Sequence, residues 1–229
     1  MNHGTAFARA ALTFTLALGL GAAPALAQDH QHMEGHHAAA DLPDGWMAHF
    51  DGGHGAHGAD DLNFSEMAPG WHITTGPSGI FYKHDFRAEG DFTVESEIHL
   101  FDPGERRESF GIFIGGSALH GDEQRYTYFL VRRTGEFMIR HRVGEELHDV
   151  MGWTAHEAVH GWDDRDEGAV SVPNVLSVRV EGADVIFSVN GTEVHGAQRD
   201  ALDVDGHFGL RINHGLDLHV TGIEMTPAS

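Results

Sequence analysis

The feature that most constrains this chain is a strict alternation of apolar and polar side chains with a period of two. It is clearest over residues 91–101. One set of alternate side chains is mostly apolar: Phe92, Val94, Ser96, Ile98 and Leu100. The other set is polar or charged: Thr93, Glu95, Glu97 and His99. This pattern predicts an antiparallel strand with one face in a core and the other in solvent.

Similar short segments recur along the chain, separated by turns rich in glycine. Residues 45–50 have enough bulk for a first strand, and residues 109–115 form an aromatic and β-branched run. Asn190-Gly191, a strong hairpin signal, leads into another strand that starts at Thr192. Three further pairs lie around compact turns: 126–132 with 136–142, 174–181 with 184–189, and the closing pair 206–212 with 216–225 around Asn213-His214-Gly215.

The spacing of these segments predicts the fold class. We expect roughly eleven to thirteen strands and no amphipathic helix. One apolar face per strand favours two sheets packed face to face. We therefore predict an all-β fold, a two-sheet antiparallel jelly-roll sandwich over residues 45–226. The chain has no cysteine, which excludes disulfides, thiolate metal sites and cysteine nucleophiles.

The order of several short motifs resembles the concanavalin A-like lectin/glucanase superfamily. The motifs are residues 74–82 (TTGPSGIFY), 91–97 (DFTVESE), 109–113 (SFGIF), 174–178 (NVLSV), 185–191 (VIFSVNG) and 209–212 (GLRI). Within the superfamily, the pattern looks most like laminin-G-like jelly rolls and the 3-keto-disaccharide hydrolase domain family. The resemblance implies a concanavalin A-like sandwich, glycosides as ligands and, if the protein is an enzyme, a glycoside hydrolase-like activity. It identifies no catalytic residue.

Residues 1–27 have the three parts of a secretory signal peptide. Arg9 supplies the positive charge, residues 10–20 are apolar, and Ala25-Leu26-Ala27 forms a site with small residues for signal peptidase. A membrane anchor, the alternative, would need about 20 apolar residues. We expect cleavage after Ala27, no stable membrane anchor afterwards, and an exported protein that is periplasmic or extracellular.

The formal net charge of the chain is −21. Such a surface repels nucleic acid and anionic lipid, so we expect no nucleic-acid partner. It is compatible with cations or neutral sugars as ligands, and equally with a role in solubility alone. No feature of the sequence indicates an oligomeric state.

Residues 28–44 are predicted to be a disordered leader, because they have little to bury. They are rich in histidine and include Met33. Neutral imidazoles suit Cu, Ni and Zn, and a thioether adds a ligand for Cu(I). The candidate metal ligands are His30, His32, His36 and His37. One alternative function is therefore a non-enzymatic periplasmic protein that binds transition metal through this leader. A flexible tail that binds metal only adventitiously is the competing interpretation.

Residues 156–160 (HEAVH) match a zinc-hydrolase motif. On a helix, H-E-x-x-H places two imidazoles one turn apart around zinc, with the Glu as general base. A zinc hydrolase that uses His156, Glu157 and His160 is thus a second alternative function. However, the segment lies in a connection rich in Gly and Asp, where a solvent-facing loop or a helical turn is the competing interpretation.

Glu95 and Glu97 are candidates for a glycosidase pair. Their Cα atoms are about 6.5–7 Å apart on one strand face. Sandwich glucanases carry an E-x-D-x-x-E cluster on one strand, and residues 95–100 (ESEIHL) lack its central Asp and final Glu. Alternating charges on a solvent-facing surface explain both residues equally well.

A sugar site combines aromatic rings with planar polar groups. Alternation places Arg132 on the same face as Tyr126 and Tyr128, and it turns Arg140 and Arg211 away from their apolar strand neighbours. The candidate ligand-binding residues are Tyr126, Tyr128, Arg132, Arg140, Trp153, Trp162, Arg211 and His214. Core or rim packing is the alternative for the two tyrosines and Trp153. The first hypothesis is thus an exported carbohydrate-binding or glycoside-processing jelly roll.

Overall fold

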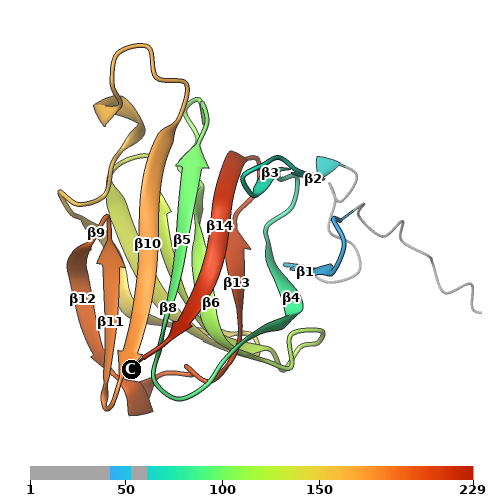
Figure 1. Ribbon diagram of the computed structural model, residues 1–229, viewed down its shortest axis with the longest axis vertical. Coiled ribbons are helices and arrows are strands. Elements are labelled where there is room, and N and C mark those ends of the chain that lie inside the picture. The colour runs from blue at the N-terminus through green and yellow to red at the C-terminus, as the bar shows by residue number, and fades with distance from the viewer. Residues whose placement is uncertain (1–41, 53–60, 229) are drawn as a thin grey trace, which may run out of the picture. The chain divides into compact units, whose positions relative to one another are not determined.

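The computed structural model describes residues 42–52 and 61–228. Within them, fourteen strands form two seven-stranded antiparallel sheets, which pack face to face (Figure 1). The predicted fold class, a two-sheet jelly-roll sandwich, is confirmed. The described residues include two short 3₁₀ turns, η3 (Trp162–Asp164) and η4 (Arg199–Ala201). No helix in these ranges is long and apolar enough to cross a membrane.

The strands of the first sheet come from both halves of the chain. They are β1 (Trp46–Phe50), β4 (Gly79–Ala88), β6 (Ser109–Ser117), β7 (Arg125–Arg132), β8 (Glu136–Val143), β9 (Glu146–Ala155) and β13 (Gly206–Ile212). Their order across the sheet is β1-β4-β13-β6-β7-β8-β9.

The strands of the second sheet also come from both halves of the chain. They are β2 (Asn63–Glu66), β3 (Trp71–Thr74), β5 (Phe92–Leu100), β10 (Val172–Glu181), β11 (Asp184–Val189), β12 (Thr192–Gln198) and β14 (Asp217–Pro227). Their order is β12-β11-β10-β5-β14-β3-β2.

The core lies between the sheets and is built by the predicted alternation. The apolar set of β5 is buried, and its polar set lies on the outer face. Phe129 of β7 meets Phe187 of β11 across the core, with ring centres 5.5 Å apart. Burial of one such side chain contributes about 1.5–3 kcal/mol.

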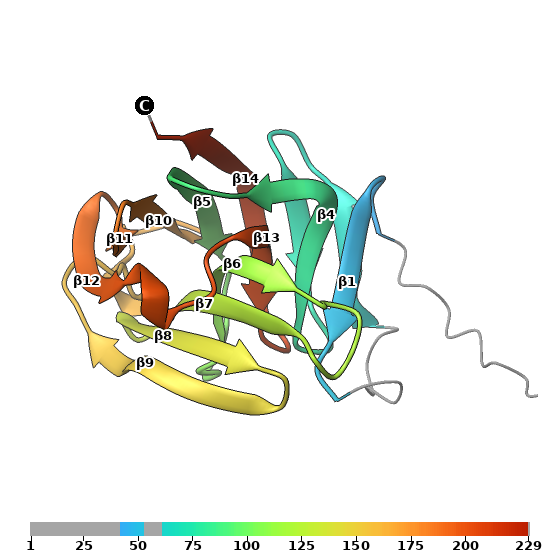
Figure 2. The ribbon, with the colours of Figure 1, turned by 90° about the horizontal axis from the view of Figure 1, so that it is seen from below.

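The first sheet also buries side chains on its outer face, which is turned away from the core. A second cluster there consists of Ile80, Tyr82, Phe113, Leu119, Tyr126, Tyr128, Leu130 and Met138. Figure 2 shows the strong twist of this sheet, with β1 and β4 running nearly across β8 and β9. The twist brings side chains from distant strands together over the outer face.

The predicted hairpins β7–β8 and β10–β11 are confirmed by their antiparallel registers. Asn190 and Gly191 form the predicted turn, with φ values of 50° and 78°. Both are in the left-handed region that a two-residue hairpin turn of this type needs.

The prediction of a closing pair was wrong. β13 lies between β4 and β6 in the first sheet, whereas β14 lies between β5 and β3 in the second. Residues 213–215 therefore carry the chain from one sheet to the other. The predicted strand number was also too low, since β9 alternates poorly and its residues are mostly exposed.

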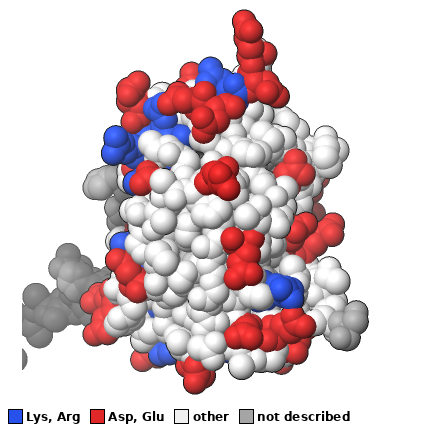
Figure 3. Space-filling view, turned by 90° about the vertical axis from the view of Figure 1, so that its left-hand side faces the viewer, with Lys and Arg blue, Asp and Glu red and all other residues white. Residues whose placement is uncertain are grey.

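Acidic side chains dominate the charged surface. Asp and Glu clearly outnumber Lys and Arg on the side of the molecule shown in Figure 3. This agrees with the net charge of −21, and it makes any local gathering of arginines notable.

Candidate ligand-binding site

Most of the predicted ligand-binding residues gather on the outer face of the first sheet. Strand register places Tyr128 opposite Arg140 on β8, and Tyr126 opposite Arg142. Trp153 of β9 packs against the same aromatic cluster. We call this surface the site face and define it by Tyr82, Tyr126, Tyr128, Arg132, Arg140, Arg142, Trp153 and Arg211.

The three tyrosines of the chain form the floor of the site face. Tyr82 and Tyr126 are each 1% exposed and Tyr128 is 5% exposed. The ring centres of Tyr126 and Tyr128 are 5.6 Å apart, and the Tyr82 hydroxyl lies 3.1 Å from Nε2 of His120. The core-packing interpretation therefore holds for Tyr126 and Tyr128, because their rings are too buried to act as open stacking platforms.

Burial also changes the ionisation of these phenols, because it disfavours the charged phenolate. It raises the pKa of Tyr82 to about 12. It also raises the pKa of Tyr126 and of Tyr128. At neutral pH all three hydroxyls are therefore hydrogen-bonding groups without charge.

Arg132 and Trp153 form a rigid pair at one side of this floor. The guanidinium carbon of Arg132 lies 4.1 Å from the centre of the Trp153 ring. Nη2 of Arg132 also donates to Oε2 of Glu136 over 2.7 Å. Hydrogen bonds from Arg132 and Thr134 lower the pKa of Glu136, so the carboxylate stays charged and keeps Arg132 in place.

Arg140 is held between a carboxylate and a phenol. Its Nε donates to Asp149 of β9, and Tyr128 lies directly opposite it in the strand register. The Arg140 side chain is 31% exposed and that of Asp149 is 55% exposed. This corner of the site face is therefore open to solvent, and its donors have fixed directions.

Arg211 is the most deeply buried cation of the site face, with 8% exposure. One terminal nitrogen donates to Asp51, whose other oxygen lies 3.5 Å from Nη1 of Arg142. The guanidinium also lies over the Tyr128 ring, at 5.8 Å from its centre. Nε and Nη1 of Arg211 are buried without a hydrogen-bond partner in the described chain.

Asp51, Arg142 and Tyr82 were missed by sequence reasoning. Arg142 lies two residues after Arg140 and alternates in the same way, so the sequence did contain a signal for it. Asp51 had no signal, because its partner Arg211 is 160 residues further along the chain.

Two predicted residues lie elsewhere. Trp162 packs in the core between the sheets and against Arg165. His214 lies in the connection after β13, with Nε2 at 3.1 Å from Glu108 and Nδ1 at 3.1 Å from the Ser78 hydroxyl. Neither side chain contributes to the site face. The sequence could not indicate that the connection after β9 folds back onto the core.

No family model matches the chain, and no curated protein matches its sequence. Solved structures match its shape. The carbohydrate-binding module CBM66 from Bacillus subtilis aligns with a TM-score of 0.55 at 14% identity, over 79% of this chain and 94% of the module. The carbohydrate recognition domain of Emp46p aligns with a TM-score of 0.52 at 7% identity, over 83% and 95%. A galectin-like protein from Bacillus subtilis gives 0.51 at 12% identity, over 80% and 89%.

The chain has the concanavalin A-like jelly-roll fold. The predicted fold is thereby confirmed, whereas membership of the 3-keto-disaccharide hydrolase domain family is not shown. At identities this low, the shared shape shows the fold alone.

In this concanavalin A-like sandwich the HEAVH segment is a turn and not a helix. The amide of Val159 donates to the carbonyl of His156 over 3.0 Å. Nδ1 of His156 accepts from the amide of Ala158, and Nδ1 of His160 lies 3.2 Å from the carbonyl of Pro173. The helix that a zinc hydrolase motif requires is therefore contradicted, and the loop interpretation is confirmed.

Three candidates remain: a metal site within the described residues, the histidines of the leader, and the pair of Glu95 and Glu97. No group of three or more His, Asp or Glu side chains within residues 42–52 and 61–228 is arranged to hold a metal. The predicted ligands His30, His32, His36 and His37 lie outside the described residues. Glu95 and Glu97 lie on the outer face of the second sheet, where Glu95 faces Glu224 and Glu97 accepts from His99 over 2.9 Å.

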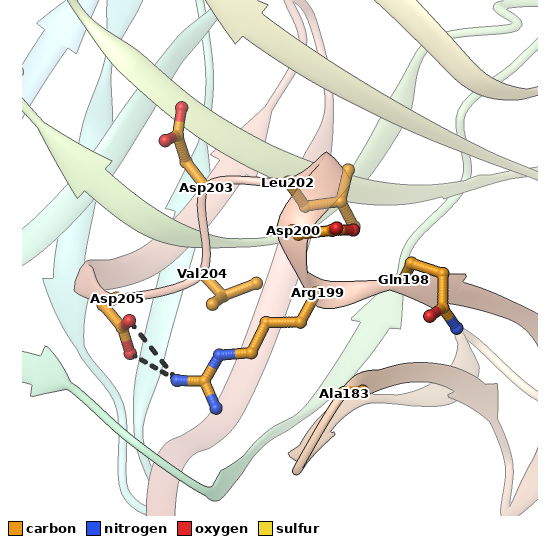
Figure 4. Close-up of a pocket in the computed structure, with 8 residues that line it drawn as sticks. All are labelled: Ala183, Gln198, Arg199, Asp200, Leu202, Asp203, Val204 and Asp205. Atoms are coloured by element: carbon orange, nitrogen blue, oxygen red, sulfur yellow. Dashed lines mark hydrogen bonds and ion pairs between the residues drawn. The ribbon is translucent and has the colours of Figure 1, made fainter.

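A hollow of about 520 Å³ lies beside η4, lined by Arg199 and three aspartates among others (Figure 4). Arg199 donates to Asp205 and Asp91, both at 3.0 Å. Asp203 accepts from Arg125 over 3.0 Å, and lies 2.6 Å from Nε2 of His141. These groups are already paired with one another, so the hollow is a junction between turns and we assign it no ligand.

Proposed function

We propose that this protein is an exported carbohydrate-binding jelly roll that holds a glycoside on the site face. The observation that carries the proposal is the pair of Arg132 and Trp153, in which the guanidinium carbon lies 4.1 Å from the centre of a partly buried indole ring. Arg132 is held in place because it also pairs with Glu136 over 2.7 Å. The hydroxyl oxygens of a sugar accept hydrogen bonds from guanidinium donors, and an indole ring packs on the apolar face of a sugar ring.

The open corner of the site face supports the same ligand class. Arg140 and Asp149 supply fixed donors and acceptors there. Trp153 supplies an aromatic ring that is only partly buried. Aromatic surface beside rigid polar groups is the usual composition of a sugar site.

The named structural neighbours add support. By their names, CBM66 is a carbohydrate-binding module and the Emp46p domain is a carbohydrate recognition domain. The resemblance to the 3-keto-disaccharide hydrolase domain family favours glycosides as the ligands. The proposal is limited to binding, and it assigns no catalytic residue.

Export of the protein and metal binding by the leader remain predictions. The signal peptide of residues 1–27 and most of the leader of residues 28–44 lie outside the described residues. N-terminal sequencing of the secreted protein tests cleavage after Ala27. A chain that keeps its first residues after export would contradict it.

Calorimetric titration of the chain against soluble neutral and acidic oligosaccharides tests the proposed function. Arg140→Ala and Trp153→Ala are each expected to weaken binding at least about tenfold, because about 1.4 kcal/mol of contact energy corresponds to that factor. Arg179→Ala is the matched control, since Arg179 pairs with Glu181 on the second sheet much as Arg140 pairs with Asp149.

The control variant should bind like the unaltered chain. Equal losses in Arg140→Ala and Arg179→Ala would show that the site face does not carry the ligand. A complete absence of oligosaccharide binding would remove the proposed function altogether.

A further inference from the structure

The site face gathers positive charge on a molecule that is otherwise strongly acidic. The chain has 14 Lys and Arg residues against 35 Asp and Glu residues. Four of the basic residues lie on the site face: Arg132, Arg140, Arg142 and Arg211. The composition of the chain does not lead one to expect such a gathering, so its balance of charge is informative about the ligand.

The four guanidinium groups share three carboxylates. Two of the arginines each have a carboxylate to themselves, Arg132 with Glu136 and Arg140 with Asp149. The other two share Asp51, because Arg211 donates to one of its oxygens and Nη1 of Arg142 lies 3.5 Å from the other. These ion pairs therefore leave one positive charge uncompensated, at the end of the site face that Asp51, Arg142 and Arg211 form.

Arg142 is the arginine of this end that a ligand can reach. Its side chain is 18% exposed, whereas Arg211 is buried. Nε of Arg142 donates to the carbonyl of Gly144 over 2.8 Å, which holds the guanidinium in place. The 3.5 Å from Nη1 to Asp51 exceeds the usual length of an N–H···O hydrogen bond, about 2.7–3.2 Å. Asp51 therefore attracts Arg142 without a close hydrogen bond to Nη1, and Arg211 adds its charge without touching the ligand.

A carboxylate is the ligand group that suits this end of the site face. Guanidinium and carboxylate are both planar, and they pair through two parallel hydrogen bonds. The net charge of −21 opposes an acidic ligand only weakly at physiological salt, because charges more than about 8 Å apart are then largely screened. The groups next to the ligand decide, and here they have an excess of positive charge.

The length of the site face indicates how large the ligand is. Glu136, the partner of Arg132, and Arg142 lie on the same strand, β8. The strand rises about 3.3 Å per residue, so they are about 20 Å apart. A ligand that contacts Arg142 as well as the Trp153 ring beside Arg132 is therefore an oligosaccharide and not a single sugar.

We propose that the glycoside of the site face is an acidic oligosaccharide, with one carboxylate paired to Arg142 and a sugar ring on Trp153. This inference rests on the proposed function, because it names the ligand class of the same site. A neutral oligosaccharide would leave the excess charge of Arg142 and Arg211 without a partner.

Titration calorimetry of the full chain at about 0.15 M salt tests the inference with matched pairs of ligands. The ligands are oligosaccharides of galacturonic, glucuronic and mannuronic acid, each compared with its own methyl ester. The ester keeps the sugar chain and removes the charge. At least one acid is expected to bind at least about tenfold more tightly than its ester.

Three variants locate the charge that causes this preference. Arg142→Gln should remove most of the preference for the acid, whereas Arg179→Gln, the control on the second sheet, should leave it unchanged. Asp149→Asn should strengthen binding of the acid about threefold, because it removes a negative charge beside the ligand. A merely structural role of Asp149 predicts no such gain. Thermal melts should show that the variants are folded.

The outcomes separate this inference from the proposed function. Esters or neutral oligosaccharides that bind as tightly as the acids would overturn the inference and leave carbohydrate binding in place. An equal preference for the acid in the Arg142→Gln and Arg179→Gln chains would also overturn it. If none of these oligosaccharides binds, the inference and the proposed function both fail.

Discussion

At the residue scale, the ion pair between Arg211 and Asp51 dominates the site face. Arg211 is almost fully buried, while the Asp51 side chain is 34% exposed. Removing one partner of a buried pair leaves the other charge unpaired, which is strongly destabilising. Here partial solvent access to the carboxylate reduces that penalty.

Asp51→Asn should therefore lower the free energy of unfolding by about 2 kcal/mol, measured by urea denaturation. Asp163→Asn is the control, because Asp163 is 83% exposed and lies 3.6 Å from Arg133. Its effect should stay within about 0.5 kcal/mol. Equal effects of the two substitutions would mean that the Arg211 charge is not held by Asp51.

The tyrosines give a pH-dependent prediction. The unfolded chain ionises tyrosine near pH 10, whereas burial raises the pKa of Tyr82 to about 12 and also raises those of Tyr126 and Tyr128. The folded state thus holds these protons more tightly. The raised pKa values therefore stabilise the folded state below pH 10, and this stabilisation is lost as the pH rises towards 12.

An alkaline titration followed by tyrosinate absorbance checks this prediction. The chain has 3 tyrosines, and all lie on the site face. No part of the increase in tyrosinate absorbance should therefore have a midpoint near pH 10, where an exposed tyrosine ionises. Ionisation and loss of folded structure should occur together above pH 10. A third of the signal titrating at the ordinary pKa of an exposed tyrosine would contradict the burial of one ring.

Strand alternation predicted the orientation of Arg132, Arg140 and Arg211, because side-chain direction along a strand is a local property. It could not predict that Arg211 would be buried. That burial depends on Asp51 and on the twist of the sheet, and both arise from contacts between distant parts of the chain.

At the element scale, two asparagine side chains, buried Asn174 and part-buried Asn190, hold the HEAVH turn against the second sheet. Oδ1 of Asn174 accepts from the amide of His160, and its Nδ2 donates to the carbonyl of His160. Nδ2 of Asn190 donates to the carbonyl of Ala158 over 2.8 Å. The turn is therefore held by hydrogen bonds and needs no metal for its shape.

Asn174→Ala should lower the free energy of unfolding by about 1–3 kcal/mol, since it removes a buried side chain that makes hydrogen bonds with the backbone of His160 and the side chain of Asn190. Urea denaturation measures this loss. Asn63→Ala, at an exposed position of β2, should change little. If the Asn174→Ala and Asn63→Ala proteins were equally stable, the turn would not depend on this amide.

The sequence predicted most strands but misassigned the last two. β13 and β14 each alternate correctly, and the short link at residues 213–215 has the composition of a hairpin turn. Alternation is the same whether a chain turns within a sheet or crosses to the other one. The choice is set by the partners already in place, β4 and β6 for β13, and β5 and β3 for β14.

At the scale of the whole molecule, the net charge of −21 opposes folding through self-repulsion. Glu95 and Glu224 face each other directly across β5 and β14. Salt shortens the range of this repulsion, from about 30 Å at 0.01 M to about 8 Å at 0.15 M.

The melting temperature should therefore rise by a few degrees as sodium chloride increases over that range, as measured by circular dichroism. Glu224→Gln should increase the free energy of unfolding by about 0.2–1 kcal/mol at low salt, because it removes one of two like charges in direct opposition. It should also reduce the salt-dependent increase. A melting temperature that falls with added salt would show that attractive surface pairs outweigh the net repulsion.

The central claim is that a glycoside binds on the outer face of the first sheet. Chemical-shift mapping of the backbone amides during titration with the best-binding oligosaccharide tests it most directly. The largest shifts are expected at Arg140, Asp149, Trp153 and Arg211. Shifts confined to the second sheet, or to the hollow beside η4, would contradict the claim and place the ligand elsewhere.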